Sequence, residues 1–129
     1  PMAVCRAFAT AMLGHDTRTD TGPEQAWRRA APYLVDPLST QWPQRADARW
    51  TEWVAHRAWT LVRLDEWVGD DLPDEPGVAY RSVLASTTPV GADGWRGPTE
   101  RHAVHCALIR SGHGWRIVDV VVDDLDGER

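Results

Sequence analysis

The side chains best suited to metal binding in this chain stand together in the stretch HAVHC, residues 102–106. Imidazole and thiolate groups are the usual protein ligands of zinc and other transition metals. In an extended strand, however, His102 and Cys106 share one face while His105 points to the other. The three groups cannot converge on one ion without a bulge. The stretch is therefore interpreted as an ordinary strand, and no metal or cofactor is expected.

A second possible chemistry is proton transfer in an enclosed site. It requires a carboxylate or histidine with a tuned pKa, together with a hydrogen-bond donor for the developing enolate oxygen. The side chains that could take part are Asp16, His56, Tyr80, His105 and Asp119.

Asp119 stands out because it interrupts the apolar side of the last predicted strand, between Ile117 and Val121. A buried carboxylate there would need a partner and would have a shifted pKa, as catalytic groups often do. The alternative is an aspartate that faces water on an open sheet face, or that pairs with a nearby arginine. The arginines considered are Arg57, Arg63 and Arg81. We favour this alternative and predict no catalytic residue.

Four carboxylates lie close together in the Gly- and Pro-rich segment 69–77, namely Asp70, Asp71, Asp74 and Glu75. The segment has the composition of a loop. Its carboxylates lack the regular ligand spacing of a calcium site, so we interpret it as a solvated turn.

Length and charge limit the class of protein. A chain of 129 residues fits a single domain, 1–129, and can bury about two-thirds of its unfolded surface in one core. The net charge of -5 argues against nucleic-acid binding, because such proteins gain affinity by neutralising phosphates. All 14 basic residues are arginine, and asparagine is absent too, a bias that indicates a high-GC, actinobacterial genome.

The two cysteines leave two alternatives open. Cys5 and Cys106 could form one bond that joins the first helix to the sheet, or both could remain buried free thiols. The sequence contains neither an apolar run long enough to cross a bilayer nor a signal peptide. Because the chain begins at Pro1 rather than at Met, we expect an excised domain of a membrane-anchored protein. Without such an anchor, a cytoplasmic location is expected.

Helical patterns come first along the chain. Apolar spacing predicts a helix over 2–13, ended by Gly14, with Cys5 and Phe8 on its buried face. Thr21 and Glu24 have capping-box spacing and predict a second helix through about residue 31, with Trp27 and Ala30 directed inward. A short helix from Asp36-Pro37 to Trp42 is expected next. The segment 43–55 fits either helical spacing or strand alternation, and we favour a short helical turn there.

Strand patterns follow at about 56–68, 78–90, 99–110 and 114–122, before a polar tail at 123–129. Short links predict antiparallel pairing, so the expected fold class is α+β, with N-terminal helices packed on a curved four-stranded antiparallel sheet. In the last strand, alternation places Val118, Val120 and Val122 on one face and Trp115, Ile117 and Val121 on the other. Two apolar faces predict a strand inside the sheet, paired on both sides.

The eight tryptophans have two interpretations. Trp27, Trp59 and Trp115 are expected in the core, where a large ring buries much area. The other five lie in or near connections, and if several are exposed together they would mark a protein interface. These five are Trp42, Trp50, Trp53, Trp67 and Trp95.

The order of helices before strands, closed by the Gly-Trp-Arg-Ile pattern at 114–117, resembles the nuclear-transport-factor-2-like (cystatin-like α+β) superfamily. Within it, three stretches look most like the TcpC-type soluble domains of actinobacterial and Gram-positive conjugation proteins. They are FATAML at 8–13 with Asp16, the stretch from Trp27 to Leu34, and GWRGP at 94–98. In such proteins a transmembrane helix precedes the domain, which lies outside the cytoplasm and acts as a scaffold.

The resemblance therefore implies a non-enzymatic, extracytoplasmic scaffold of conjugative transfer or type IV secretion, which binds other membrane or secretion-complex proteins through its sheet face and its tryptophan-bearing loops. A rival hypothesis is a small-molecule binder or an isomerase- or cyclase-type enzyme. It would use the internal cone of the fold, with Asp119, His105 or Tyr80 as working groups. A third hypothesis is a module that self-associates through its open sheet face.

Overall fold

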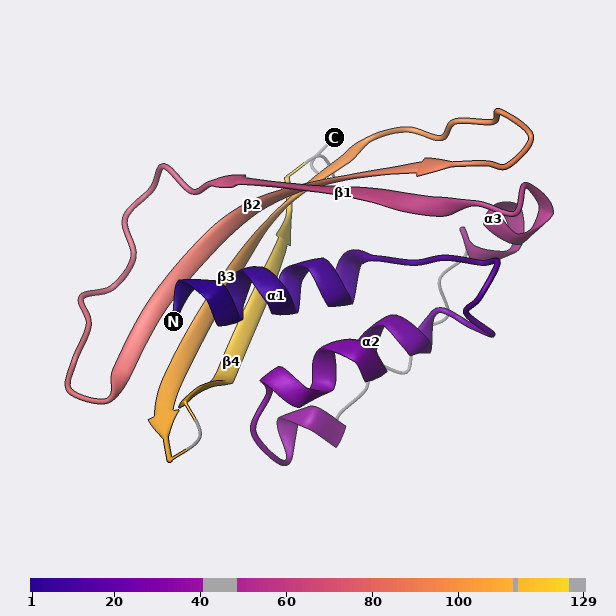
Figure 1. Cartoon of the computed structure of the whole chain (residues 1–129). Helices are drawn as coiled ribbons and strands as arrows, with labels where there is room; N and C mark the ends of the chain where they lie inside the picture. Colours follow the sequence, from indigo (N-terminus) through magenta and orange to yellow (C-terminus); the bar gives the residue numbers. More distant parts are fainter. Residues whose placement is uncertain (41–48, 113, 126–129) are drawn as a thin grey trace.

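The structure, a computed structural model, describes residues 1–40, 49–112 and 114–125. Helices precede a four-stranded antiparallel sheet of order β1-β2-β3-β4, as predicted (Figure 1). The elements are α1 (Met2–Leu13), α2 (Glu24–Ala30), two 3₁₀ turns (Ala31–Tyr33 and Leu38–Thr40), α3 (Trp50–Ala55), β1 (Trp59–Glu66), β2 (Val78–Val90), β3 (Glu100–Ser111) and β4 (Gly114–Asp124). No described helix has the length and apolar character needed to cross a membrane.

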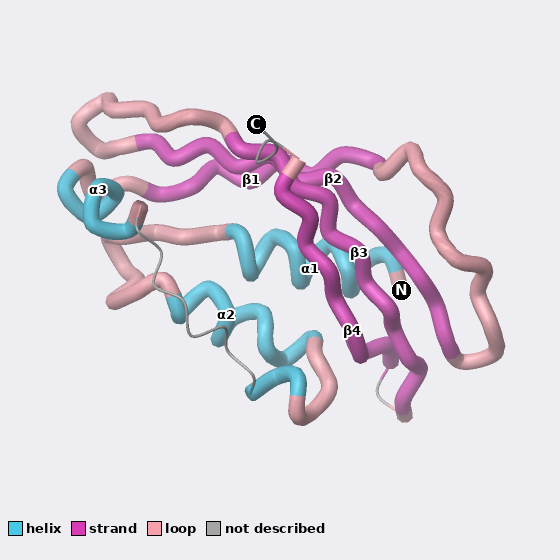
Figure 2. The backbone as a smooth tube through the Cα atoms, turned by 180° about the vertical axis from the view of Figure 1, so that it is seen from behind, coloured by secondary structure: helices cyan, strands magenta, loops and turns pink. Residues whose placement is uncertain are grey.

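The core lies between α1 and the face of the sheet that we call the inner face. α1 contacts all four strands, and α2 packs beside it (Figures 1 and 2). Cys5, Phe8, Trp27 and Ala30 are buried as predicted, and the rings of Phe8 and Trp27 meet edge to face at 6.4 Å. The helical periodicity of the first segment therefore identified its buried face correctly.

Cys5 and Cys106 form a disulfide that ties α1 to β3, with Cα atoms 6.0 Å apart. Of the two alternatives left open by the sequence, the structure has the bonded one. The bond closes a sequence separation of 101 residues, and cross-links over long loops remove much entropy from the unfolded chain.

Alternation along β2 and β3 sorts their side chains between two faces. Val83, Val104, Cys106 and Leu108 are buried in the core with α1, while His105 lies on the opposite face, which we call the outer face. The predicted separation of His105 from Cys106 is thus confirmed.

β4 differs from its prediction in two ways. Leu108 pairs with Ile117, but the preceding Ala107 pairs with Asp119, so Val118 is an extra residue in a β-bulge. Beyond the bulge the faces exchange: Val120 packs on the core and Val121 is exposed on the outer face. Strict alternation over 114–122 was therefore wrong.

The expectation that β4 lies inside the sheet was also wrong, because β4 is an edge strand. The segment after α2 covers its first half. Leu34 forms a parallel bridge with Ile117, and the Val35 N–H donates to the Ile117 carbonyl at 2.9 Å. This contact covers the edge of β4 at Ile117 and leaves Val118, Val121 and Val122 exposed.

The cap of α2 and the boundaries of β1 and β4 also differ from the predicted ones. No side-chain cap forms at α2, and the Thr21 N–H instead donates to Gln25 Oε1, so the predicted capping box is wrong. β1 begins at Trp59 rather than at 56, because Arg57 adopts a positive φ of 51° in the turn after α3. Asp123, predicted in the tail, belongs to β4.

The short helix predicted after Asp36-Pro37 is a 3₁₀ turn at Leu38–Thr40. Trp42, where that helix was expected to end, lies outside the described residues, as does the 43–48 part of the predicted helical turn. The rest of that turn is α3, which confirms the helical interpretation over Trp50–Ala55.

Candidate functional site

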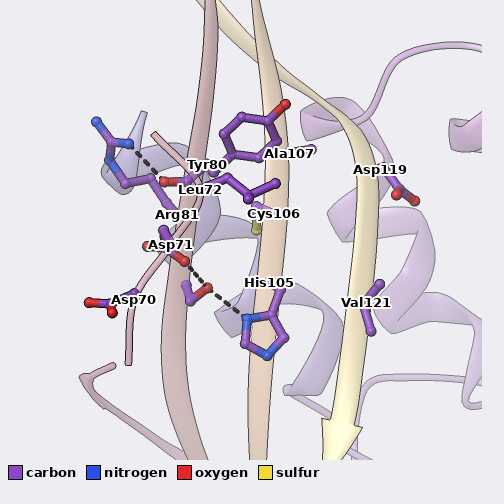
Figure 3. A pocket seen from close by; sticks show the side chains of 11 residues that line it. Asp70, Asp71, Leu72, Tyr80, Arg81, His105, Cys106, Ala107, Asp119 and Val121 are labelled. Atoms are coloured by element: carbon purple, nitrogen blue, oxygen red, sulfur yellow. Dashed lines mark hydrogen bonds between the residues drawn. The ribbon is translucent and has the colours of Figure 1, made fainter. Parts of the chain in front are cut away.

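A pocket of about 240 Å³ lies on the outer face of the sheet, under the loop that joins β1 to β2 (Figure 3). Three of the five proton-transfer candidates, Tyr80, His105 and Asp119, line it. None of the three lies between the helices and the sheet, where the rival hypothesis of a proton-transfer enzyme requires them. Tyr80 and His105 alternate with core residues along their strands, and the bulge at Val118 turns Asp119 away from the face that Ile117 occupies. The full lining is Asp70, Asp71, Leu72, Tyr80, Arg81, Ser82, His105, Cys106, Ala107, Asp119 and Val121.

A chain of hydrogen-bonding groups crosses this pocket. Ser82, on β2, pairs directly with His105 on β3, and its Oγ lies 2.7 Å from His105 Nδ1 and 2.5 Å from Asp71 Oδ1 (Figure 3). His105 Nε2 lies 3.3 Å from Asp123 Oδ2. Both ends of the chain are therefore carboxylates.

The donors in this chain can be assigned from valence. An ionised carboxylate only accepts, so the Ser82 hydroxyl donates to Asp71, and His105 Nδ1–H must donate to Ser82. At its other nitrogen His105 again faces a carboxylate, that of Asp123.

The acidic loop between β1 and β2 is held against β2 and β3. Asp74 makes two hydrogen bonds to the Arg81 guanidinium, at 2.7 and 2.9 Å, and the Trp67 ring meets His105 edge to face at 5.0 Å. The Arg81 guanidinium lowers the pKa of Asp74, and Asp74 raises the pKa of Arg81. All four carboxylates of the loop are exposed, as the interpretation of a solvated turn predicted, and Asp71 and Asp74 also bind Ser82 and Arg81.

Ser82, His105 and Asp123 are the residue types of a nucleophilic triad, but the geometry opposes that chemistry. A serine nucleophile must pass its proton to the histidine and reach the substrate. Ser82 is only 3% exposed, and its hydroxyl proton is held by Asp71. This arrangement fastens the loop to the sheet instead of activating an oxygen.

Asp119 is exposed and lines the pocket, in agreement with the favoured interpretation of an aspartate facing water. Two of the arginines considered as its partners are engaged elsewhere, since Arg81 pairs with Asp74 and Arg63 lies 3.4 Å from Asp65. Asp119 therefore contributes negative charge to an accessible surface.

The space between α3 and the inner face of the sheet contains a smaller cavity, of about 80 Å³. Trp53, only 4% exposed, fills much of this region, and an Arg49–Glu100 ion pair borders it. None of the five proton-transfer candidates lines this cavity. Ligand pockets usually measure about 300 to 1,000 Å³, so this cavity is too small for a substrate of ordinary size.

The two remaining candidates stabilise connections. Asp16 accepts two hydrogen bonds from the Arg18 guanidinium, which lies over the Trp59 ring at 3.9 Å and lowers the pKa of Asp16. His56 Nδ1 lies 2.8 Å from Asp93 Oδ2 and lowers the pKa of that carboxyl.

Three tryptophans that lie in or near connections contact histidine rings. His56 stacks on Trp95 with ring centroids 4.3 Å apart, and Trp50 and Trp67 are likewise half-buried against His15 and His105. Trp27 is buried and the half-buried Trp115 packs against the core, as predicted, whereas Trp59 is half-buried outside that cluster. Among the described residues no tryptophan is exposed, so the expected aromatic surface is not found there, and Trp42 lies outside them.

Sequence reasoning missed the parts played by Asp71, Ser82 and Asp123. Each is unremarkable in its local pattern, and only the strand register brings Ser82 opposite His105. Within the described part of the chain, no group of three His, Cys, Asp or Glu side chains could hold a metal ion. Comparison of the chain with protein-family models, curated proteins and solved structures finds no match.

Proposed function

We propose that this chain is the extracytoplasmic domain of a membrane-anchored protein of conjugative transfer or of a related type IV secretion system. In this proposal it is a non-enzymatic scaffold with a nuclear-transport-factor-2-like fold, and it joins partner proteins through the outer face of its sheet. The observation that carries the proposal is the exposure of apolar side chains on β4, with Val121 half exposed beside the acidic pocket. Apolar groups rimmed by charge are typical of protein interaction sites.

The disulfide between Cys5 and Cys106 supports the extracytoplasmic location. Such bonds persist in oxidising compartments and are rare in the reducing cytoplasm. The three TcpC-like stretches support the link to conjugation, and the order of helices before an antiparallel sheet is compatible with it.

The use of the ionisable groups supports a scaffold over the rival enzyme. Asp71, Ser82 and His105 bind one another and fasten a loop, and the cavity beside α3 is small. A proton-transfer enzyme requires such groups to converge on a substrate in an enclosed space.

The proposal is tested in the host by deleting the gene and restoring it with variants. We expect deletion to abolish conjugative DNA transfer, and Val121→Arg to fail to restore it, because the substitution places a charge on the proposed contact surface. Val54→Arg on α3 is the matched control, since Val54 is 48% exposed and Val121 is 50% exposed. Normal transfer in the deletion strain, or with Val121→Arg at normal protein level, would contradict the proposal.

A further inference from the structure

The second half of β4 is a free sheet edge. Leu34 and Val35 pair with this edge at Ile117, but over 118–123 no described residue forms a backbone bridge with the edge that faces away from β3. A strand edge presents backbone N–H and C=O groups that can pair with another chain. The exposed apolar side chains of this segment are Val118 at 42%, Val121 at 50% and Val122 at 40%.

Carboxylates dominate the charge next to this edge. Asp119 and Asp123 are exposed on β4, and Asp70 and Asp71 approach from the loop across the pocket. The one arginine in the pocket lining, Arg81, is neutralised by Asp74. Lysines, which often protect sheet edges, are absent from the whole sequence.

The negative charge of the edge disfavours a second copy of this chain as its occupant, because both copies would bring the same exposed carboxylates, Asp119 and Asp123. In the symmetric antiparallel register centred on Val121, Asp119 of one copy would stand directly opposite Asp123 of the other. Like charges at such cross-strand positions are destabilising. Charge complementarity instead favours a basic partner.

We infer that the β4 edge, Val118–Asp123, accepts an extended arginine- or lysine-bearing segment of a partner protein as a fifth strand. The inference rests on the proposed scaffold function and specifies the chemistry of its partner. In an added strand, every second side chain lies on the outer face, where cationic groups meet Asp119 and Asp123 and reach the pocket. The alternate side chains extend the apolar row of Val120 and Val122.

The test uses a nine-residue peptide in which arginine alternates with valine or threonine, titrated into the isotopically labelled chain and followed by NMR. One control peptide has glutamate in place of each arginine. A second keeps the arginines but carries N-methyl groups on the backbone nitrogens of both edges, which removes strand pairing and leaves the charge unchanged. We expect the arginine peptide to shift the amide signals of Val118–Asp123. We expect the N-methylated peptide to bind at least about tenfold more weakly and the glutamate peptide not to bind.

Two protein variants sharpen the test. Asp119→Asn removes one carboxylate and should weaken binding of the arginine peptide severalfold, whereas Val54→Arg on α3 should leave binding unchanged. Absence of binding by the arginine peptide, equal binding by the N-methylated peptide, or signal shifts away from β4 would each overturn the inference.

The outcome is separable from that of the scaffold function. If the arginine peptide fails to bind while Val121→Arg still abolishes DNA transfer, the partner chemistry is wrong and the scaffold function stands. If the peptide binds β4 as expected while Val121→Arg restores transfer, the scaffold function is wrong and the strand-accepting edge stands.

Discussion

The two faces of the sheet are built from the same strands and differ in almost every physical property. On the inner face, Val104 and Cys106 pack against α1 and share a dry core closed by a disulfide. On the outer face, His105 lies between them in sequence but takes part in a network of carboxylates beside an open pocket. One residue along a strand is enough to move a side chain from a core to a charged surface.

The comparison also separates stability from recognition. Apolar burial and the cross-link hold the inner face, so changes there should affect the free energy of unfolding. The outer face is held by hydrogen bonds and ion pairs with exposed partners, which contribute less to stability but present charge to a ligand. The following predictions test this division.

The largest effect is expected on the inner face. Replacing both cysteines, as Cys5→Ala with Cys106→Ala, should lower the free energy of unfolding by about 4 kcal/mol, because the bond constrains a long stretch of the unfolded chain. Urea denaturation followed by circular dichroism measures the loss. A double variant that unfolds at the same urea concentration as the native chain would contradict the assigned role of the bond.

An intermediate effect is expected at Ser82. Ser82→Ala leaves Asp71 and His105 Nδ1 without their shared partner, and losing a partner of this kind costs about 1 to 3 kcal/mol. Amide exchange in the loop 67–77 should become faster, while exchange in α1 should change little. Ser86→Ala, at an outer-face position nearer the other end of β2, is the matched control. If the two variants speed amide exchange in the loop equally, the hydrogen bonds of Ser82 do not fasten the loop.

The smallest effect is expected from acid titration of the surface ion pairs. Arg81 and His56 lower the folded-state pKa of Asp74 and Asp93, so the unfolded chain binds more protons in acid. These pairs therefore stabilise the fold above the unfolded pKa, about 4, and their contribution is lost as the pH falls through the folded values. Urea unfolding at about pH 5 and about pH 3 measures the loss as a difference in the free energy of unfolding, and Asp74→Asn should reduce this difference. If Asp74→Asn leaves the difference between the two pH values unchanged, the Asp74–Arg81 pair does not contribute to the pH dependence of stability.

The sequence by itself determined the helices and strands in which apolar residues recur at a regular spacing. Periodicity and the Gly14 signal predicted the bounds of α1, Met2–Leu13, and strand-forming composition predicted β2 at Val78–Val90, because each residue's burial in these segments follows its own position. The same alternation separated His105 from Cys106 before any partner strand was known. The α+β class followed from the order of these elements.

Only the tertiary structure decided which distant residues meet. The bulge at Val118, the edge position of β4, the Cys5–Cys106 bond and the contact between Ser82 and His105 all depend on register and packing between segments far apart in the chain. Local patterns carry no record of such pairings, because their energy comes from the partner rather than from the segment itself. For that reason the sequence predicted which residues could do chemistry, but not that three of them would gather outside the core.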